Sequence, residues 1–415
     1  YESAVGTNFD AYNAKALSLG SASNITDRSG YCLLFNPSNL SMSMKSGILV
    51  NASVITDSRF ERRGMIVKDS FGDYLTVSDY VKNNSIYNTV AFSAKYTTTL
   101  LSKYNIGIGL SRSPLNSFNY YYEEEIRGQL DSDDGEIFSR DPLLGYHIIE
   151  SNGILINNSF GSSIGFDITN DLTASFGYAF NMISGDQSTT ESINIDTTSL
   201  WYNSLAQESF LEENTELSDL SSYNAAYTFS PASFYTIGSN IKFKEYLLNV
   251  SFQKGAVISK SIDIDDLIEI FNSTVDNGLD EDNYIGNDHI VNHFMLKISD
   301  VYKPMKINLG FSILNKDSDD FNFIANYELN KYDDSSSLSS FSRYTIAVDH
   351  RGYRNIPLRF GIEYQTSPFK PYVSSVSSFS MGSGINIEKL ILDFGINYRH
   401  STYSFPDMFP VKNDY

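Results

Sequence analysis

Apolar and polar residues alternate along much of this chain. In the segment 305–315, four bulky apolar residues fall on one face, and Lys, Asn, Gly and Ser fall on the other. Successive side chains of a β-strand point to opposite faces, so a two-residue period with one apolar face predicts strands. Further segments with this period are 172–182, 246–253, 321–329, 356–365 and 390–399. The sequence therefore predicts an all-β fold.

The composition of the two faces favours a membrane barrel over a soluble sandwich. The apolar face is uniformly bulky and the other is rich in Gly, Ser and Asn, which suits lipid outside and a polar lumen inside. Aromatic residues make up 14% of the chain, as expected where rings gather at the membrane interfaces. No apolar run reaches the ~18 residues of a spanning helix. Because unpaired backbone groups are not tolerated in hydrocarbon, we expect a transmembrane antiparallel β-barrel of about fourteen strands.

Short and long connections alternate between the predicted strands. The short ones are 101–103, 170–171, 244–245 and 302–304, and the long polar ones are about 58–84, 113–150, 185–222 and 259–289. Outer-membrane barrels have short periplasmic turns and long extracellular loops, so we assign the two classes to these two sides. The boundaries around 316–345 and 385–392 stay open, because 388–389 is short for an external loop and 331–340 is long for a periplasmic turn.

A segment of small residues precedes the first strand. Proline forces an extended conformation on the residue before it, and an asparagine side chain bonds to nearby backbone, so Asn36 and Pro37 predict a sharp turn into that strand. We expect residues 1–42 to form a plug in the lumen and 43–415 to form a single barrel domain. The small plug residues suited to a crowded lumen include Ala14, Ala16, Gly20 and Ala22. Leu33, Leu34 and Phe35 would pack against the wall or line a ligand pocket.

The N-terminal pattern resembles the start of the FadL/OmpP1 family of outer-membrane transporters. In that family G-A-R-A-x-x-M-G-G-A leads at fixed spacing into N-P-A-x-L. The matching positions are Ala14, Lys15, Ala16, Leu19, Gly20, Ala22, Asn36, Pro37 and Leu40, whereas Arg28, Ser29 and Ser38 depart from the pattern. The resemblance implies passive uptake of hydrophobic or amphipathic molecules, such as long-chain fatty acids, across the bacterial outer membrane, with no cofactor or energy source.

A proline interrupts the strand predicted at about 106–118. Pro114 donates no ladder hydrogen bond, so the strand must kink, bulge or stop there. The resembled family carries a G-x-G…P-[FY]-G-L element in its third strand, where an inward kink opens a gap in the wall for ligand. Gly107, Gly109 and Pro114 match it, and the positions after the proline do not. The resemblance thus makes Pro114, Leu115 and Phe118 candidate ligand contacts; alternatively, Pro114 lies just above the membrane, where the strand ends.

Two long loops contain apolar stripes with helical spacing. The stripe in 199–213 includes Trp201 and Leu205, and that in 263–274 includes Leu267 and Phe271 after an acidic start that suits a helix N-terminus. Either these helices fold onto the barrel rim, or they form an external groove that first captures a ligand. The second interpretation draws on the resembled family, which carries loop helices after its fifth and seventh strands.

The net charge and the acidic segments limit the classes of molecule that the chain is expected to bind. A net charge of −20 argues against nucleic acid, which requires basic patches. Acidic segments at 123–125, 131–136 and 276–288 are expected to be solvated loops, with calcium binding left open; 131–135 lacks the spacing of a calcium hand because its glycine comes one position early. The expected partners are membrane lipid and a hydrophobic small molecule.

No pattern predicts an enzyme, a cofactor or a metal site. Residues 161–165 fit G-x-S-x-G, but a nucleophile motif needs a strand-to-helix turn and these lie within a strand. His289 and His293 would stand ~13 Å apart on the strand expected there, too far for one ion. Cys32 is the single cysteine, so no internal disulfide is expected. We expect Cys32 to be buried in the plug beside Leu33. Since the chain starts at Tyr1 without a leader, we expect a signal peptide to have been removed.

Two other functions stay open. Relatives with this N-terminal pattern, the PorV-type adaptor barrels, serve secretion or surface attachment. In that case the acidic loops at 113–150 and 276–288 would bind a protein partner. The third alternative is a structural surface barrel without a transported ligand.

Overall fold

The computed structural model describes residues 5–42, 46–68, 71, 73–100, 103–127, 142–195, 222–261, 300–314, 321–353, 356–370 and 372–403. The N-terminal segment holds β1 (Thr7–Asn8), α2 (Ala14–Ser18), α3 (Ser23–Thr26), α4 (Cys32–Phe35) and the 3-10 helix η1 (Pro37–Met42). We call residues 5–42 the plug segment. Its helices are short, and most of its residues from Asp10 to Ser41 are buried, so the surrounding wall rather than helix propensity holds them.

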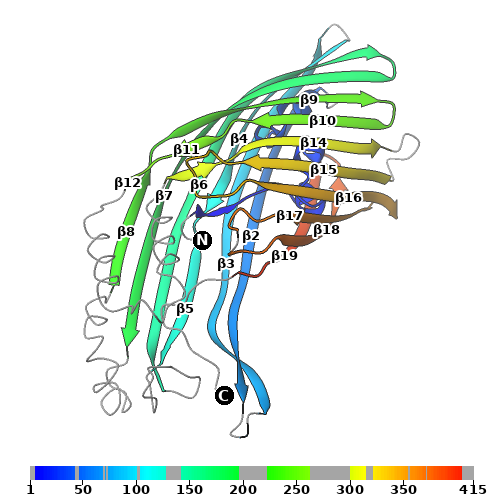
Figure 1. The fold of residues 1–415 in the computed structure, drawn as a ribbon. Coiled ribbons are helices and arrows are strands. Elements are labelled where there is room, and N and C mark those ends of the chain that lie inside the picture. Colours follow the sequence, from blue (N-terminus) through cyan, green and yellow to red (C-terminus); the bar gives the residue numbers. More distant parts are fainter. Residues whose placement is uncertain are drawn as a thin grey trace.

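Long antiparallel strands surround the plug segment (Figure 1). They are β2 (Gly47–Lys68), β3 (Tyr74–Leu100), β4 (Tyr104–Ser117), β5 (Tyr120–Arg127), β6 (Leu143–Thr169), β7 (Leu172–Ile195), β8 (Ser222–Phe229), β9 (Ala232–Phe243), β10 (Tyr246–Gln253), β11 (Ala256–Ile258), β12 (Lys260–Ser261), β13 (Val301–Lys303), β14 (Met305–Leu314), β15 (Phe321–Lys331), β16 (Phe341–Tyr353), β17 (Ile356–Gln365), β18 (Val376–Ile387) and β19 (Leu390–His400). β11 and β13 form a separate two-stranded sheet.

The wall is one antiparallel ladder from β2 to β19. Its successive positions are β2, β3, β4 with β5, β6, β7, β8 with β9, β10 with β12, β14, β15, β16, β17, β18 and β19. The described residues thus give thirteen positions, compared with the about fourteen strands that we expected. Near the ends of the ladder, Arg63 of β2 donates a 3.3 Å hydrogen bond to Tyr403, which follows β19. The predicted antiparallel barrel with an N-terminal plug is confirmed.

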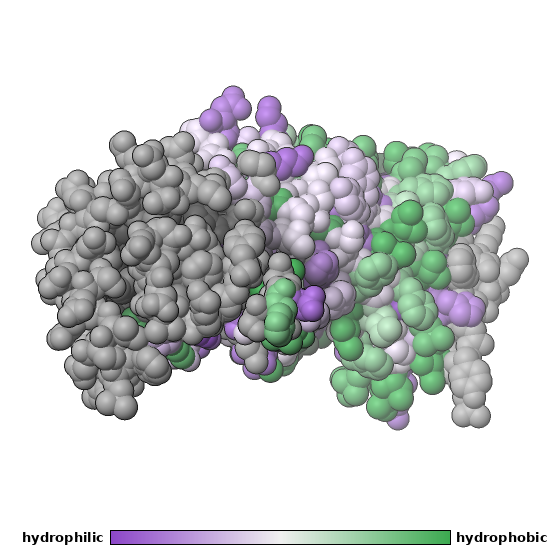
Figure 2. Space-filling view, turned by 60° about the horizontal axis from the view of Figure 1, so that its bottom comes forward, coloured by the Kyte–Doolittle hydropathy of each residue, from purple (hydrophilic) through white to green (hydrophobic). Residues whose placement is uncertain are grey.

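The two faces of the strands separate as the alternation predicts. Along β17, exposed residues such as Phe360 and Ile362 alternate with buried Arg359 and Glu363. The exposed positions of the wall carry Ile, Leu, Val, Phe and Tyr, whereas the buried positions that face the plug carry mainly Ser, Asn, Thr and Gly. Figure 2 shows apolar side chains concentrated toward one end of the molecule, on the right, beside a paler band. Within the described ranges, no helix is both long and apolar enough to cross a membrane.

The strand order corrects one predicted turn. We expected 302–304 to be a short turn between two strands, but β10 pairs directly with β14, for example Val250 with Leu309. No strand therefore stands between them, and Lys303 and Pro304 lie on the side of the long loops. The same order puts 388–389 with the short turns at 170–171 and 244–245, and puts 332–340 on the long-loop side. This removes the mismatch in length that the sequence left open.

Two further predicted features are found in the structure, and others lie outside the described residues. Cys32 is buried in the plug segment as expected, and residues 161–165 lie inside β6 rather than at a strand-to-helix turn. The loop residues Trp201, Leu205, Leu267 and Phe271, together with the acidic segments 131–136 and 276–288 and with His289 and His293, lie outside the described residues.

Candidate functional site

The Asn36–Pro37 turn anchors the plug segment. Asn36 has an extended backbone (φ −153°, ψ 97°), as a residue before proline requires. Its Oδ1 accepts hydrogen bonds from the Ser38 backbone N–H (3.1 Å) and from Ser38 Oγ (2.6 Å), and its Nδ2 donates to Asn240 Oδ1 of β9 (3.3 Å). This asparagine thus stabilises the turn and also attaches it to the wall.

Wall asparagines extend the attachment. Asn240 donates to Ser38 Oγ (2.7 Å) and to Asn39 Oδ1 (2.8 Å), and Asn249 of β10 donates to the backbone oxygen of Asn24 (2.8 Å). Asn24 in turn donates to Asn326 of β15 (2.9 Å). Because these groups are buried and bonded to one another, the polar lumen is filled by a specific network and not by solvent alone.

Glycines on the wall make room for the plug segment. Gly177 of β7 and Gly238 of β9 are directly paired. A Cβ at Gly238 would overlap Asn36 Oδ1, and a Cβ at Gly177 would overlap the backbone of Pro37 and Ser38. On the far side of the lumen, Gly361 of β17 touches the backbone of Leu19 and Gly20 in the same way. The small residues predicted in the plug segment therefore face small residues on the wall.

A buried ionic cluster ties the start of the plug segment to the opposite wall. The Asp10 carboxylate lies 2.7 Å from Arg343 of β16 and 2.8 Å from Arg399 of β19. Burial alone would raise the pKa of Asp10, but the two guanidinium groups outweigh it and lower the pKa below its ordinary value. Asp10 is therefore a buried, paired anion at neutral pH.

The barrel wall breaks between β3 and β4. Their ladder ends at Phe92 and Arg112, and the next pairing on this side of β3 is Val81 with Glu124 of β5. Over residues 82–91, β3 keeps its pairing with β2, while no pairing links it to β4 in the described part of the wall. At ~3.3 Å per residue, this break is about 30 Å long.

The break begins where the outer face of the wall becomes polar. Leu110 and Phe160 are paired, exposed and apolar, whereas two residues further along Arg112 bonds to Asn158 (3.1 Å) on the exposed surface. Pro114 follows immediately and pairs with Ile156 of β6, so β4 does not end at the proline.

The plug segment covers part of this edge. β1 pairs with β4 through Thr7 with Ser117 and Asn8 with Asn116. The N–H of Phe9 also donates to the carbonyl of Leu115 (3.1 Å), which lies at a bulge where the β4–β6 register shifts. The N-terminal strand therefore occupies hydrogen-bonding positions on the β4 edge that β3 leaves.

An apolar cluster lies behind the break. Of the predicted ligand residues it contains Leu34, Phe35, Leu115 and Phe118. The members that the sequence analysis did not identify are Tyr12, Tyr31, Ala91, Leu155, Ile183, Phe229, Phe234, Ile258 and Val301. Leu33 belongs to a different cluster, with Cys32, Leu40 and Ala179. The apolar cluster thus joins the plug segment to β3 and β4 at the break and to β8, β9, β11 and β13.

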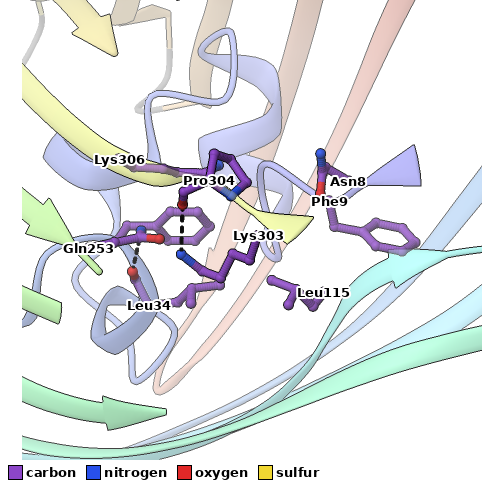
Figure 3. A pocket seen from close by; sticks show the side chains of 9 residues that line it. Asn8, Phe9, Leu34, Leu115, Gln253, Lys303, Pro304 and Lys306 are labelled. Atoms are coloured by element: carbon purple, nitrogen blue, oxygen red, sulfur yellow. Dashed lines mark hydrogen bonds between the residues drawn. The ribbon is translucent and has the colours of Figure 1, made fainter. Parts of the chain in front are cut away.

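A small cavity adjoins this cluster (Figure 3). It is lined by Asn8, Phe9, Leu34, Phe35, Leu115, Gln253, Lys303, Pro304 and Lys306. Its volume of about 20 Å³ has room for about one water molecule. A ligand larger than water can therefore enter only if side chains or the N-terminal strand move.

No protein family and no curated protein matches the sequence. Among solved structures, a Pseudomonas aeruginosa FadL homologue matches with a TM-score of 0.50 and 12% identity, over 96% of this chain and 91% of that chain. The P. putida toluene transporter TodX matches with a TM-score of 0.47 and 13% identity, over 94% of this chain and 92% of that chain. The Ralstonia pickettii toluene transporter TbuX matches with a TM-score of 0.42 and 12% identity, over 95% of this chain and 98% of that chain. By its likeness to the P. aeruginosa homologue, the chain has the fold of a FadL-type barrel with an N-terminal plug.

Proposed function

We propose that this barrel carries hydrophobic or amphipathic small molecules passively into the bacterial outer membrane. A ligand would enter from the long-loop side, occupy the apolar cluster and leave sideways through the break between β3 and β4. The fold, shared with a FadL homologue, supports an outer-membrane location. The observation that carries the proposal is that Leu115 and Phe118, which lie along the break on the side opposite β3, belong to the same apolar cluster as Leu34 and Phe35 of the plug segment.

The cavity is too small for the proposed ligand as it stands. A space of about 20 Å³ does not hold a hydrocarbon, so ligand entry must displace groups that now fill the lumen. The side chains of Leu34 and Phe35 are candidates, as is β1, which is bound to β4 by few hydrogen bonds. Transport would run down a gradient and use no cofactor, since filling and emptying the site requires only these displacements.

Ala91 offers a test, because it is fully buried on β3 within the break and belongs to the apolar cluster. Ala91→Trp should fill the path. The control is Ala94→Trp on the same strand, which lies on the outer face and pairs with Leu110. Barrels reconstituted into liposomes would be assayed for uptake of radiolabelled palmitate and of toluene. We expect A91W to slow uptake at least tenfold and A94W to leave it unchanged. Wild-type uptake by a folded A91W barrel would contradict the proposed path.

A second function, as an adaptor for a protein partner, is favoured by one observation. The β2–β3 hairpin extends far beyond the short strands β14 to β19 (Figure 1). Apolar side chains near its tip are exposed. They are Ile66, Phe71, Tyr74, Leu75 and Val77, with Phe71 90% exposed. A stoichiometric protein that copurifies with the wild type from native membranes but not with a Phe71→Ser, Leu75→Ser variant would support this function.

A further inference from the structure

Three aromatic rings surround the ammonium of Lys260 on the long-loop side of the apolar cluster. Its Nζ lies 4.8 Å from the centroid of the Tyr227 ring, 5.8 Å from that of Phe229 and 6.0 Å from that of Phe118. A cation within about 6 Å of a ring centroid is attracted by the negative face of the ring. The three rings therefore form an aromatic cage, which a side chain of the protein itself fills in this structure.

The aromatic cage is built by β8 and by the residue that follows β4. Tyr227 and Phe229 lie two residues apart on β8 and share one face, and Lys260 shares it as the direct partner of Phe229. The N–H of Phe118 donates to the carbonyl of Gly153 (2.9 Å), and its ring stacks on that of Phe229, with 5.3 Å between the centroids. All three rings are buried. Because these contacts do not run through the Lys260 side chain, we expect the rings to stay in place if it leaves.

The Lys260 side chain can leave the aromatic cage while its backbone stays. The residue is only partly buried, so its side chain has access to solvent. Its backbone is held separately, by the pairing with Phe229 and by a hydrogen bond from its N–H to the Asp300 carboxylate (3.1 Å). Burial lowers the pKa of Lys260 to about 8, so its ammonium loses more by leaving water than it gains from its neighbours. A primary ammonium is thus a poor occupant of the aromatic cage.

A methylated ammonium would fit the aromatic cage better than the lysine does. A lysine ammonium is a compact, strongly hydrated charge with three N–H donors that need partners, whereas a quaternary ammonium has no such donors. Aromatic rings attract both kinds of cation, and rings that surround a quaternary ammonium leave no donor unsatisfied. The charge of the chain acts in the same direction, because a net charge of −20 attracts cations and Asp300 lies next to Lys260.

We propose that the aromatic cage binds the head of a cationic amphiphile with a methylated ammonium group, which displaces the Lys260 side chain. Phe118 and Phe229 are also members of the apolar cluster, so the hydrocarbon part of the ligand would continue from the cage into that cluster. This inference rests on the proposed uptake function and narrows its substrate class. Lys260 occupies the site when no ligand is bound, and a neutral molecule of the same shape lacks the cation–ring attraction that offsets its displacement.

The test compares phenyltrimethylammonium with tert-butylbenzene, which has the same shape and no charge. Binding of both probes to the full barrel in non-ionic detergent would be measured by isothermal titration calorimetry at pH 7. The ratio of the two affinities is compared between variants, because partition of each probe into micelles is the same for every variant. A desolvated cation–ring contact corresponds to up to about a thirtyfold gain in affinity. We expect Lys260→Ala, which removes the competing ammonium, to raise the preference for the cation at least threefold above that of the wild type.

A second variant tests the rings themselves. Tyr227→Leu should lower the preference for the cation at least threefold, both in the wild type and in K260A. The matched control is Tyr235→Leu. Tyr235 also lies beneath a lysine, with Lys254 Nζ 6.0 Å from its centroid, but it stacks on the exposed Tyr178 on the outer face of the wall. We expect this control to leave the preference unchanged.

The outcomes separate this inference from the function on which it rests. The same affinity ratio in the wild type, K260A and Y227L would overturn the cation site, while binding of tert-butylbenzene would leave uptake of hydrophobic molecules in place. A ratio that changes in Y227L but not in K260A would overturn the displacement of Lys260. If the wild type and K260A bound neither probe, both proposals would fail. Should K260A not fold, the comparison of Y227L with Y235L still decides whether the rings bind the cation.

Discussion

Gly177 and Gly238 are paired across β7 and β9, and together they form the surface on which the Asn36–Pro37 turn rests. Neither position has space for a Cβ, because Asn36 and the backbone after it occupy that space. The plug segment is therefore fixed by shape as well as by hydrogen bonds. Gly177 and Gly238 lie 140 or more residues after Asn36 and Pro37 in the sequence. Their contact with the turn explains how such distant segments fix its position in the lumen.

Gly238→Ala should displace this turn. The added methyl group would overlap Asn36 Oδ1, and overpacking of this kind costs about 1–3 kcal/mol. We expect a lower unfolding temperature in detergent and faster amide exchange at Asn36 and Asn39, whose N–H groups donate to the carbonyls of Cys32 and Asn36, respectively. Ser239→Ala, on the outer face of the same strand, is the control. Wild-type exchange at both amides in G238A would show that the glycine pair does not seat the turn.

Asp10→Asn should weaken the other anchor of the plug segment. The substitution keeps the shape but removes the anion between Arg343 and Arg399. Arg343 retains Glu328 and Glu363 as partners, so we expect a loss of about 1–3 kcal/mol rather than loss of the fold. Chemical unfolding in detergent would measure it. Asp171→Asn, at an exposed turn, is the control, and an equal effect of the two substitutions would contradict a specific anchor.

The pH dependence of the same anchor has a defined sign. The pKa of Asp10 is lowered on folding, so its contribution to stability is complete above the ordinary carboxyl pKa and is lost only as the pH falls through the lowered value. The stability difference between the wild type and D10N should therefore be constant from pH 8 to pH 5 and shrink in stronger acid. A difference that disappears by pH 5 would contradict the paired, buried state of Asp10.

The sequence predicted what depends on local pattern. The two-residue period identified many of the strands because it follows from the geometry of each strand alone, and the constraint of Pro37 on Asn36 identified the turn for the same reason. Part of the expected loops was wrong: β2 and β3 continue through 58–68 and 74–84, and β5 occupies 120–127, where Glu124 is buried rather than solvated. The pattern wrongly predicted a turn between two strands at 302–304. A proline next to a strand gives the same local sequence pattern whether it lies in a short turn or precedes a strand after a long loop. Only the direct pairing of β10 with β14 distinguishes them.

The site itself was predicted only in part. Leu34, Phe35, Leu115 and Phe118 meet in one cluster, whereas Leu33 packs in another. Several of their partners, such as Phe229, Ile258 and Val301, come from strands more than 100 residues away. Contact between such distant segments depends on register, which a single sequence does not display. The sequence does contain one signal of these contacts. Glycines recur at inward positions of several strands, and an inward glycine indicates close approach of another backbone.

Gly6→Val should detach the N-terminal strand from β4. Gly6 has φ +79°, which a β-branched residue rarely adopts, and its Cβ would lie 3.0 Å from the Phe118 ring. Such strain costs about 1–3 kcal/mol, comparable with the few hydrogen bonds that hold β1. We expect faster exchange of the Phe9 amide, which donates to Leu115. Val5→Ala is the control, and unchanged exchange in G6V would mean that β1 stays in place despite the strain.

Lys260 should make the stability of the protein depend on pH in alkaline solution. It lies on the long-loop side, where it pairs with Phe229 of β8. β8 in turn pairs with residues 186–192 of β7, which lie beyond the row of exposed apolar side chains that Met182 belongs to. Burial lowers the pKa of Lys260 to about 8, partly opposed by Asp300. Between pH 8 and 10.5 the unfolded chain holds this proton and the folded protein does not, so stability should rise with pH in that interval, by up to about 3 kcal/mol. Lys260→Met should lack this rise. Because other groups titrate alike in both proteins, the difference between their unfolding free energies isolates the lysine, and a difference independent of pH would show that Lys260 keeps its ordinary pKa.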